Sequence, residues 1–241
     1  MPVILNIETS SDVCSVAITC DGRVLTEKES TEGLNHSKLL SVFVGDVFKE
    51  TGLEIKSVDA IAVSKGPGSY TGLRIGVSLA KGLCYALGKP LIGVGTLDSL
   101  VSHALISLDQ YISDFAIEGD ILFCPMIDAR RMEVYTSLYN RKGEKLEEVS
   151  AKIINSSSYS KYLKKHTIFF FGNGSVKCQS LIEHPNALFR GPLKSSARYM
   201  LRLAEKKYEL SKFENVAYFE PFYLKDFVAT TPGNKVIKKF K

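Results

Sequence analysis

The sequence predicts an α/β protein of two lobes, each a mixed β-sheet covered by α-helices. Three observations carry this prediction. Hairpin signals alternate with strand–helix–strand units, so antiparallel and parallel strand pairs belong to the same sheet. The order of elements in the first thirty residues recurs after residue 120. The 241 residues are enough to give each half a hydrophobic core of its own.

The first half opens with three predicted strands, at 3–8, 13–19 and 23–30. The pair Asp21-Gly22 joins the last two and is a strong hairpin signal. An apolar stripe at helical spacing then predicts a helix over 35–51, which Gly52 ends. The remaining elements are a strand at 60–63, a helix after the glycine-rich stretch 64–76, a strand at 89–94 and a helix at 96–107.

The second half repeats this order with strands at 121–129, 132–140 and 144–151. A polar turn around Arg130 and Arg131 joins the first two strands. The later elements are a helix at 158–166, a strand at 167–172, the loop 172–175 and a helix at 195–210. We expect one lobe over 1–103 and a second over 104–241, with the last ~20 residues returning to the first.

Composition places the chain among ordinary globular proteins of the cytoplasm. The net charge of +5 is mild, and part of it lies in the basic tail, which is either a weak nucleic-acid contact or a solvated terminus. No apolar run is long enough to span a membrane, and the N-terminus does not resemble a signal peptide. Five scattered cysteines without a C-x-x-C pair agree with this class, and we expect Cys14 and Cys20, on one side of a predicted strand, to be small buried hydrophobes rather than ligands or a disulfide.

Metal binding and nucleophilic catalysis find little support in the sequence. The histidines are never three or four residues apart, so no metal site is predicted; they are His36, His103, His166 and His184. We expect surface or capping roles for His36 and His103. The stretch around Ser69 does not match the G-x-S-x-G nucleophile elbow, and we predict no catalytic residue.

The glycine-rich stretch 64–76 lies between a strand and a helix, where many proteins bind phosphate. Its sequence does not fit that use, because Leu73 and Arg74 stand where a P-loop has a Lys-Ser/Thr pair. A dinucleotide fingerprint also fails, since the glycines are spaced one residue too wide.

Two other places could meet a nucleotide. Glu8 ends the first strand, and Ser11 follows in a hydroxyl-rich turn that could orient a phosphate or its metal. The alternative is that these side chains only build the turn. Gly172 and Gly174 have two possible roles as well: glycines after a strand either leave room for a nucleotide or only turn the chain.

The helix after the glycine-rich stretch has an unusual composition. Gly72, Gly76 and Ala80 form a small-residue face, beside an aliphatic face that includes Ile75, Leu79, Leu83 and Leu87. Glycine inside a helix costs roughly 1 kcal/mol against alanine, so a close packing partner is expected. That partner is either the protein's own core or the helix of another subunit.

Five segments together resemble the bacterial TsaB (YeaZ) family of tRNA-modification proteins. They are ILNIETSSDVCSVAI, HSKLLSVFVGDV, SKGPGSYTGLRIGVSLAKGLCYALGKPLIGVGTLDSL, DARRMEVYTSLY and PFYLKDF. The match is dense over 3–104, clear around 128–139 and looser beyond. The resemblance implies the actin-like two-lobed fold. It also implies a role in making threonylcarbamoyladenosine beside the tRNA anticodon.

The resemblance further implies a non-catalytic subunit that works with the catalytic paralogue TsaD and the ATPase TsaE, and that meets tRNA only through the complex. The metal histidines of TsaD fall at Thr96 and Leu100 in this sequence, and neither can ligate a transition metal. No tightly bound cofactor is expected, although a nucleotide could lie at the partner interface. The alternative function is a nucleotide-hydrolysing or phosphotransferase enzyme of the actin-like superfamily.

In the family, two helices of the first lobe bind TsaD or a second copy of the chain, which predicts a homodimer when the protein is alone. The carried-over contact surface is Leu39, Phe43, Gly72, Leu73, Ile75, Gly76, Leu79 and Leu83. Gly76→Arg is accordingly expected to disrupt the complex and leave the protein folded.

Overall fold

The computed structural model describes residues 2–33, 35–108, 110, 120–191 and 193–225. Its first sheet has five strands in the order β3-β2-β1-β4-β5. The strands are β1 (Val3–Glu8), β2 (Cys14–Cys20), β3 (Arg23–Ser30), β4 (Ala60–Gly66) and β5 (Leu91–Gly95). β1 pairs antiparallel with β2 and parallel with β4, so the predicted mixed sheet is confirmed.

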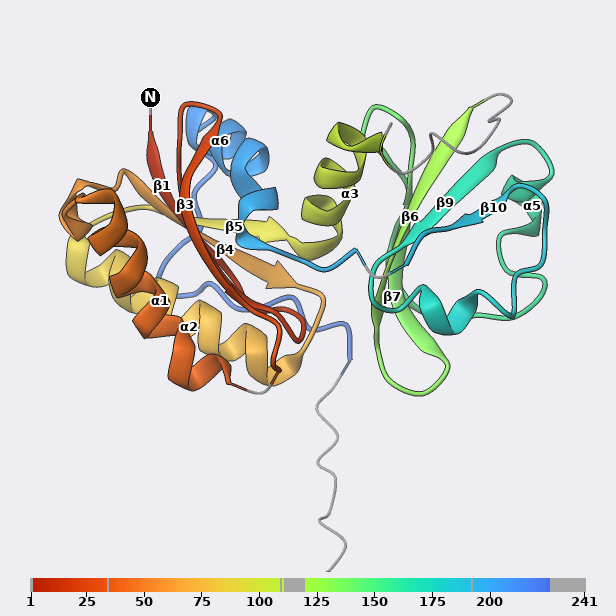
Figure 1. The fold of residues 1–241 in the computed structure, drawn as a ribbon, viewed down its shortest axis with the longest axis horizontal. Helices are drawn as coiled ribbons and strands as arrows, with labels where there is room; N and C mark the ends of the chain where they lie inside the picture. The colour runs from red at the N-terminus through yellow and green to blue at the C-terminus, as the bar shows by residue number, and fades with distance from the viewer. Residues whose placement is uncertain (1, 34, 109, 111–119, 192, 226–241) are drawn as a thin grey trace, which may run out of the picture.

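The second sheet also has five strands, in the order β10-β9-β6-β7-β8. They are β6 (Ile121–Asp128), β7 (Glu133–Tyr139), β8 (Lys145–Ile153), β9 (Thr167–Phe171) and β10 (Ala187–Phe189). Reversed, this order runs β8-β7-β6-β9-β10, which repeats the first sheet strand for strand. The repeat predicted from the sequence is therefore present as two sheets of one topology (Figure 1).

Helices α1 (His36–Thr51) and α2 (Tyr70–Leu87) cover one face of the first sheet (Figure 1). Their inward side chains, such as Leu40 and Val77, join a core with Leu5 and Ile7 of β1. The opposite face is covered by a 3-10 helix (Ala197–Met200) and α6 (Leu201–Glu209). The first sheet is therefore buried on both faces, which explains the nearly continuous apolar sequence of β1.

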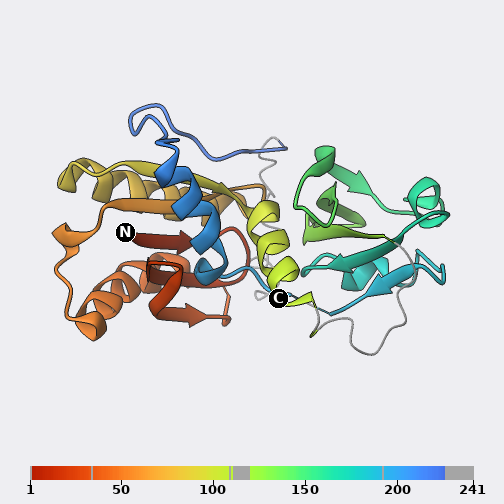
Figure 2. The same cartoon turned by 90° about the horizontal axis from the view of Figure 1, so that it is seen from above.

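One connecting helix packs on both lobes, and a second packs on a lobe different from the one expected. α3 (Thr96–Ile106) lies between the lobes and buries Leu97, Leu100 and neighbouring side chains against the second sheet (Figure 2). Its Asp98 accepts a hydrogen bond from Tyr139 Oη at 2.8 Å and pairs with Lys145 of β8. Conversely, the helical segment 197–209 follows the second sheet in sequence but packs on the first, so its predicted place in the second lobe is corrected.

The return to the first lobe thus begins before the last ~20 residues, which were expected to make it. Glu214 N donates to Leu91 O of β5 at 2.9 Å, and Phe222 N donates to Lys65 O of β4 at 2.6 Å. The predicted division after residue 103 falls inside α3 and stays a prediction, since part of the expected boundary at 103–120 lies outside the described residues.

The remaining differences are local. The helix expected at 158–166 is shortened to α5 (Ser160–Leu163), and two further 3-10 turns occur at Ile55–Ser57 and Val176–Cys178. Asp21 and Gly22 both have positive φ, as the predicted two-residue hairpin requires. Across the described ranges, no helix is long and apolar enough to cross a membrane.

Candidate functional site

The outer side of α1 and α2 forms an apolar surface on the first lobe. Leu39 and Phe43 of α1 and three aliphatic side chains of α2 are only partly buried at the edge of the core; those of α2 are Ile75, Leu79 and Leu83. Val42 lies one helical turn from Leu39 and is 53% exposed. We call these six residues, together with the exposed Gly82, the paired-helix surface. Partly exposed aliphatic groups on adjacent helices are typical of a protein contact.

Gly82 lies on this surface one turn after Leu79, and a Cβ there would find nothing within 4 Å. Gly45 of α1 is likewise open. Because glycine lowers helix stability, an exposed one inside a helix has no benefit for the isolated fold. Both positions allow the backbone of another helix to approach closely. The interface predicted from the sequence omitted Gly82 and Val42. The presence of a glycine inside the helix at position 82 could have indicated a close packing partner.

Three residues of the predicted interface are instead inside the lobe. Gly72, Leu73 and Gly76 are buried, and Leu73 has no exposed surface. A Cβ on Gly76 would lie 2.2 Å from Thr9 Oγ1. The small-residue face of α2 therefore packs against the protein's own chain. These three residues are unavailable to a partner, and Gly76→Arg would disturb the fold rather than only the complex.

The glycine-rich connection holds the chain close to the turn after β1. A Cβ on Gly68 would lie 2.2 Å from Ser10 O, and one on Gly72 would lie 2.1 Å from Thr9 O. Ser69 N donates to Ser10 O at 2.6 Å, while Ser69 Oγ caps the helix by accepting from Gly72 N at 3.2 Å. The backbone N–H groups of Ser69 and Gly72 at the start of α2 therefore already donate to acceptors of the chain itself. The glycines of this stretch therefore serve close packing. This agrees with the sequence, which does not match a phosphate-binding P-loop motif.

Glu8, proposed as a nucleotide contact, is fully buried at the end of β1. Its Oε1 accepts a hydrogen bond from Ser10 N at 2.6 Å, while Oε2 has no partner within the described part of the chain. Burial raises the pKa of this carboxyl above its ordinary value of 4.5, although hydrogen bonds from Ser10 and Ser64 oppose the shift. The carboxyl is enclosed by its own lobe.

The raised pKa of Glu8 gives a pH-dependent stability with a defined sign. Below pH 4.5 the group is protonated in both states, so its contribution is full; as pH rises, the unfolded state ionises first and stability falls. Glu8→Gln keeps an acceptor for Ser10 N and cannot ionise. We expect its urea midpoint to decline less than that of the wild type between pH 5 and pH 8.

The control is Asp12→Asn, which removes an exposed carboxylate from the same turn and should leave the wild-type profile in place. Parallel profiles for wild type and Glu8→Gln would show that Glu8 is not the source of the dependence.

The other predicted nucleotide residues have little open space beside them. Ser11 Oγ lies 2.7 Å from Ser195 Oγ, and both line a cavity of only about 10 Å³ between the lobes. Cβ atoms on Gly172 and Gly174 would lie 2.4 Å from Met126 O and 2.8 Å from Ile127 C. Close packing on β6 therefore accounts for both glycines. A nucleotide does not fit this cavity in the conformation observed.

A larger cavity of about 590 Å³ lies between the lobes on the side of the C-terminal segment. Its walls come from the end of β4, the start of α3, β8 and residues 214–222. None of Glu8, Ser11, Gly172 and Gly174 lines it. The structure thus separates the roomy part of the inter-lobe space from the residues that the sequence suggested for a nucleotide.

The described residues contain no group of three or more side chains suited to hold a metal ion. Thr96 and Leu100, at the positions of the TsaD metal histidines, are both buried. The surface or capping role expected for His36 is wrong, whereas His103 is half-buried. His36 is buried with Nε2 3.1 Å from Val13 O, and His103 stacks on Tyr199 at 3.7 Å, where burial lowers its pKa to about 4.

Of the two cysteines predicted to be buried hydrophobes, Cys14 is buried and Cys20 is half-buried. The other three cysteines are buried as well. Burial raises the pKa of the Cys14 thiol to about 11 and that of Cys84 to about 12. These thiols stay protonated at neutral pH and are poor nucleophiles.

Two sheets of one topology, separated by α3 and each covered by helices, define an actin-like two-lobed α/β protein. A model of the family described as "TsaD: tRNA N6-adenosine threonylcarbamoyltransferase" matches residues 30–232. The tRNA threonylcarbamoyladenosine biosynthesis protein TsaB of Escherichia coli is 30% identical over 235 residues, covering 94% of this chain and 96% of that one. The chain belongs to the TsaB family, which is involved in threonylcarbamoyladenosine biosynthesis.

A structural relative agrees with this assignment. The crystal structure of YeaZ from Pseudomonas aeruginosa superposes with a TM-score of 0.77 at 27% identity, over 93% of this chain and all of that one. The tRNA N6-adenosine threonylcarbamoyltransferase of Clostridium kluyveri is 27% identical over 243 residues, covering 90% of this chain and 71% of that one. The chain is thus similar along most of its length to both kinds of protein.

Proposed function

We propose that this chain is a non-catalytic subunit that binds the catalytic paralogue TsaD and supports threonylcarbamoyl transfer to tRNA. The observation that carries the proposal is the paired-helix surface, where partly exposed aliphatic side chains surround the open Gly82. Burying such a surface releases ordered water and stabilises a complex. The open Gly82 favours a helix as the element that packs there, because the missing side chain lets another backbone approach closely.

The lack of a catalytic role of its own is supported by the residues at the α3 start. Thr96 and Leu100 offer no imidazole at the positions where TsaD relatives place metal ligands, and both side chains are covered. The small cleft cavity near Ser11 also offers little room for a reacting nucleotide. Chemistry is therefore assigned to the paralogue, and positioning to this chain.

The remaining parts of the proposal follow from one shared surface. If the same helices pair in a homodimer of the free chain, dimerisation and TsaD binding exclude each other. The ATPase TsaE acts with the assembled pair, and a nucleotide could lie at the interface rather than within this chain. A tRNA substrate places this work in the cytoplasm.

Co-elution of the purified chain with TsaD of the same organism tests the association. In size-exclusion chromatography we expect a new peak that contains both proteins, together with loss of any homodimer peak. Separate elution at micromolar concentrations of both proteins would contradict the proposed partnership.

A further inference from the structure

The turn between β6 and β7 contains two consecutive arginines in an unfavourable backbone conformation. Arg130 and Arg131 have φ values of 66° and 52°, in the left-handed region that favours glycine and asparagine. The turn is closed by Ala129 N donating to Glu133 O at 3.1 Å and Glu133 N donating to Arg130 O at 3.3 Å. These bonds use only the backbone. Glycine or asparagine would make the same turn with less strain, so the turn does not require the guanidinium groups.

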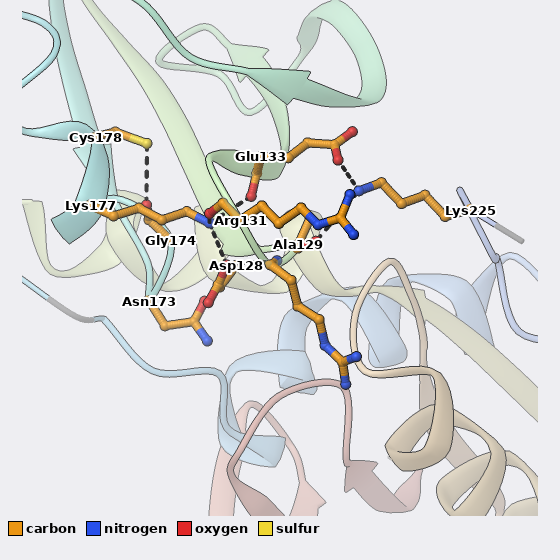
Figure 3. A network of polar contacts seen from close by, with 10 residues as sticks. Asp128, Ala129, Arg131, Glu133, Asn173, Gly174, Lys177, Cys178 and Lys225 are labelled. Atoms are coloured by element: carbon orange, nitrogen blue, oxygen red, sulfur yellow. Dashed lines mark hydrogen bonds and ion pairs between the residues drawn. The ribbon is translucent and has the colours of Figure 1, made fainter. Parts of the chain in front are cut away.

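The acids beside this turn are already paired with other cations. Lys177 Nζ lies 2.5 Å from Asp128 Oδ1 and also donates to two carbonyl oxygens of the turn, and Lys225 pairs with Glu133 (Figure 3). Arg130 and Arg131 are exposed, and within the described ranges no hydrogen bond or ion pair of their side chains is present. The two guanidinium groups therefore present uncompensated positive charge to solvent.

The second lobe as a whole strengthens this field. Residues 121–194 carry twelve Lys and Arg against six Asp and Glu, a formal charge of +6, whereas residues 1–108 and 195–225, which build the first lobe, together carry fifteen against fifteen, or 0. A lobe with a net positive charge attracts an extended polyanion such as a nucleic acid. Arginine is suited to phosphate because its planar fork donates two parallel hydrogen bonds to one group.

We propose that the Arg130-Arg131 turn contacts the phosphate backbone of tRNA directly. A backbone is favoured over a free nucleotide because the cavity lined by Ile127 and Asn173, near the turn, measures only about 10 Å³. The choice of tRNA rests on the proposed function, whereas the phosphate contact does not. This contact gives the chain a direct part in substrate binding, in addition to any contact that the assembled complex makes.

The variant Arg130→Asn/Arg131→Gly tests this contact. It supplies residues that tolerate positive φ and removes no side-chain bond of the described structure, so its melting temperature should equal or exceed that of the wild type. The control Lys164→Asn/Lys165→Gln removes the same charge from two exposed residues near the start of β9, at the other end of the sheet.

The readout is the affinity of the full chain, alone and with TsaD, for unmodified tRNA transcript over a series of salt concentrations. We expect the arginine variant to bind at least tenfold more weakly, with a log–log salt slope smaller by about two, one per arginine. The control should change affinity only two- to threefold. Equal losses in the two variants, or unchanged binding by the arginine variant, would overturn the proposal.

A further arm separates the two phosphate sources. ATP is added to the tRNA complex at concentrations too low to change the ionic strength. If ATP displaces the tRNA there, the arginines belong to a nucleotide site, and the backbone contact is overturned. Because tRNA binding is measured directly, its loss is distinguishable from failure of the proposed function. A chain that binds tRNA but never associates with TsaD would retain this contact while refuting the proposed subunit role.

Discussion

Gly82→Arg is expected to weaken assembly with TsaD strongly and leave the protein folded. The position is exposed, is open for at least 4 Å around a new Cβ, and lies in a helix where arginine is more favourable than glycine. On the paired-helix surface, however, the long charged side chain would hold a partner helix away. We expect the complex to weaken by at least about 2 kcal/mol, roughly thirtyfold in dissociation constant.

The matched control is Ile153→Arg. Ile153 is 72% exposed on β8 of the second lobe, so the change places the same side chain on an exposed apolar position far from α1 and α2. Val42→Arg on α1 should act like Gly82→Arg. Isothermal titration with TsaD distinguishes the cases, and undiminished affinity of both surface variants would remove these helices from the interface.

Gly72→Ala is expected to have the largest effect on folding. Its Cβ would lie 2.1 Å from the carbonyl oxygen of Thr9, which belongs to the backbone and cannot move aside like a flexible side chain. Either α2 or the turn after β1 must shift, and both pack against the core of the first lobe. We expect a loss of about 3 kcal/mol of unfolding free energy, the upper part of the usual range for overpacking.

The same substitution ten residues later, at Gly82, is expected to raise the free energy of unfolding instead of lowering it. Gly82→Ala meets nothing within 4 Å and should stabilise the helix by about 0.5–1 kcal/mol. Urea denaturation of both variants gives the comparison. If Gly72→Ala unfolds at the wild-type urea concentration, then the close approach of Thr9 is not what requires glycine there.

The strands and their repeat could be predicted because each piece of evidence was local. Alternating or continuous apolar runs marked the strands, and Asp21-Gly22 has the φ preferences that a two-residue hairpin needs. The repeat of strand, turn and strand after residue 120 then indicated the second sheet. Its five strands follow the topology of the first.

The placement of helices could not be predicted in the same way. An apolar stripe shows that a helix packs against something, but the stripe on α3 does not say which sheet receives it. α3 packs on the second sheet, and the segment 197–209 packs on the first. The contacts of the segment 197–209 with the first sheet join residues more than a hundred positions apart, such as Ile92 and Met200, and no local pattern encodes them.

The glycines of α2 show the same limit at the candidate surface. Gly76 and Gly82 are alike in sequence, yet Gly76 packs against Thr9 and Gly82 faces solvent. Helical spacing identified a small-residue face and an aliphatic face. Only the position of the turn after β1 decides which of the two is internal, and that turn lies about sixty residues away in the chain.

Formation of threonylcarbamoyladenosine on unmodified tRNA most directly tests the proposed role. The mixture contains the threonylcarbamoyl-adenylate synthase, TsaD and TsaE of the same organism, with or without this chain, and nucleoside product is quantified after digestion. We expect product only when the chain is present, none from the chain alone, and much less with Gly82→Arg than with the wild type. Equal product after omission of the chain would contradict its role as a required subunit.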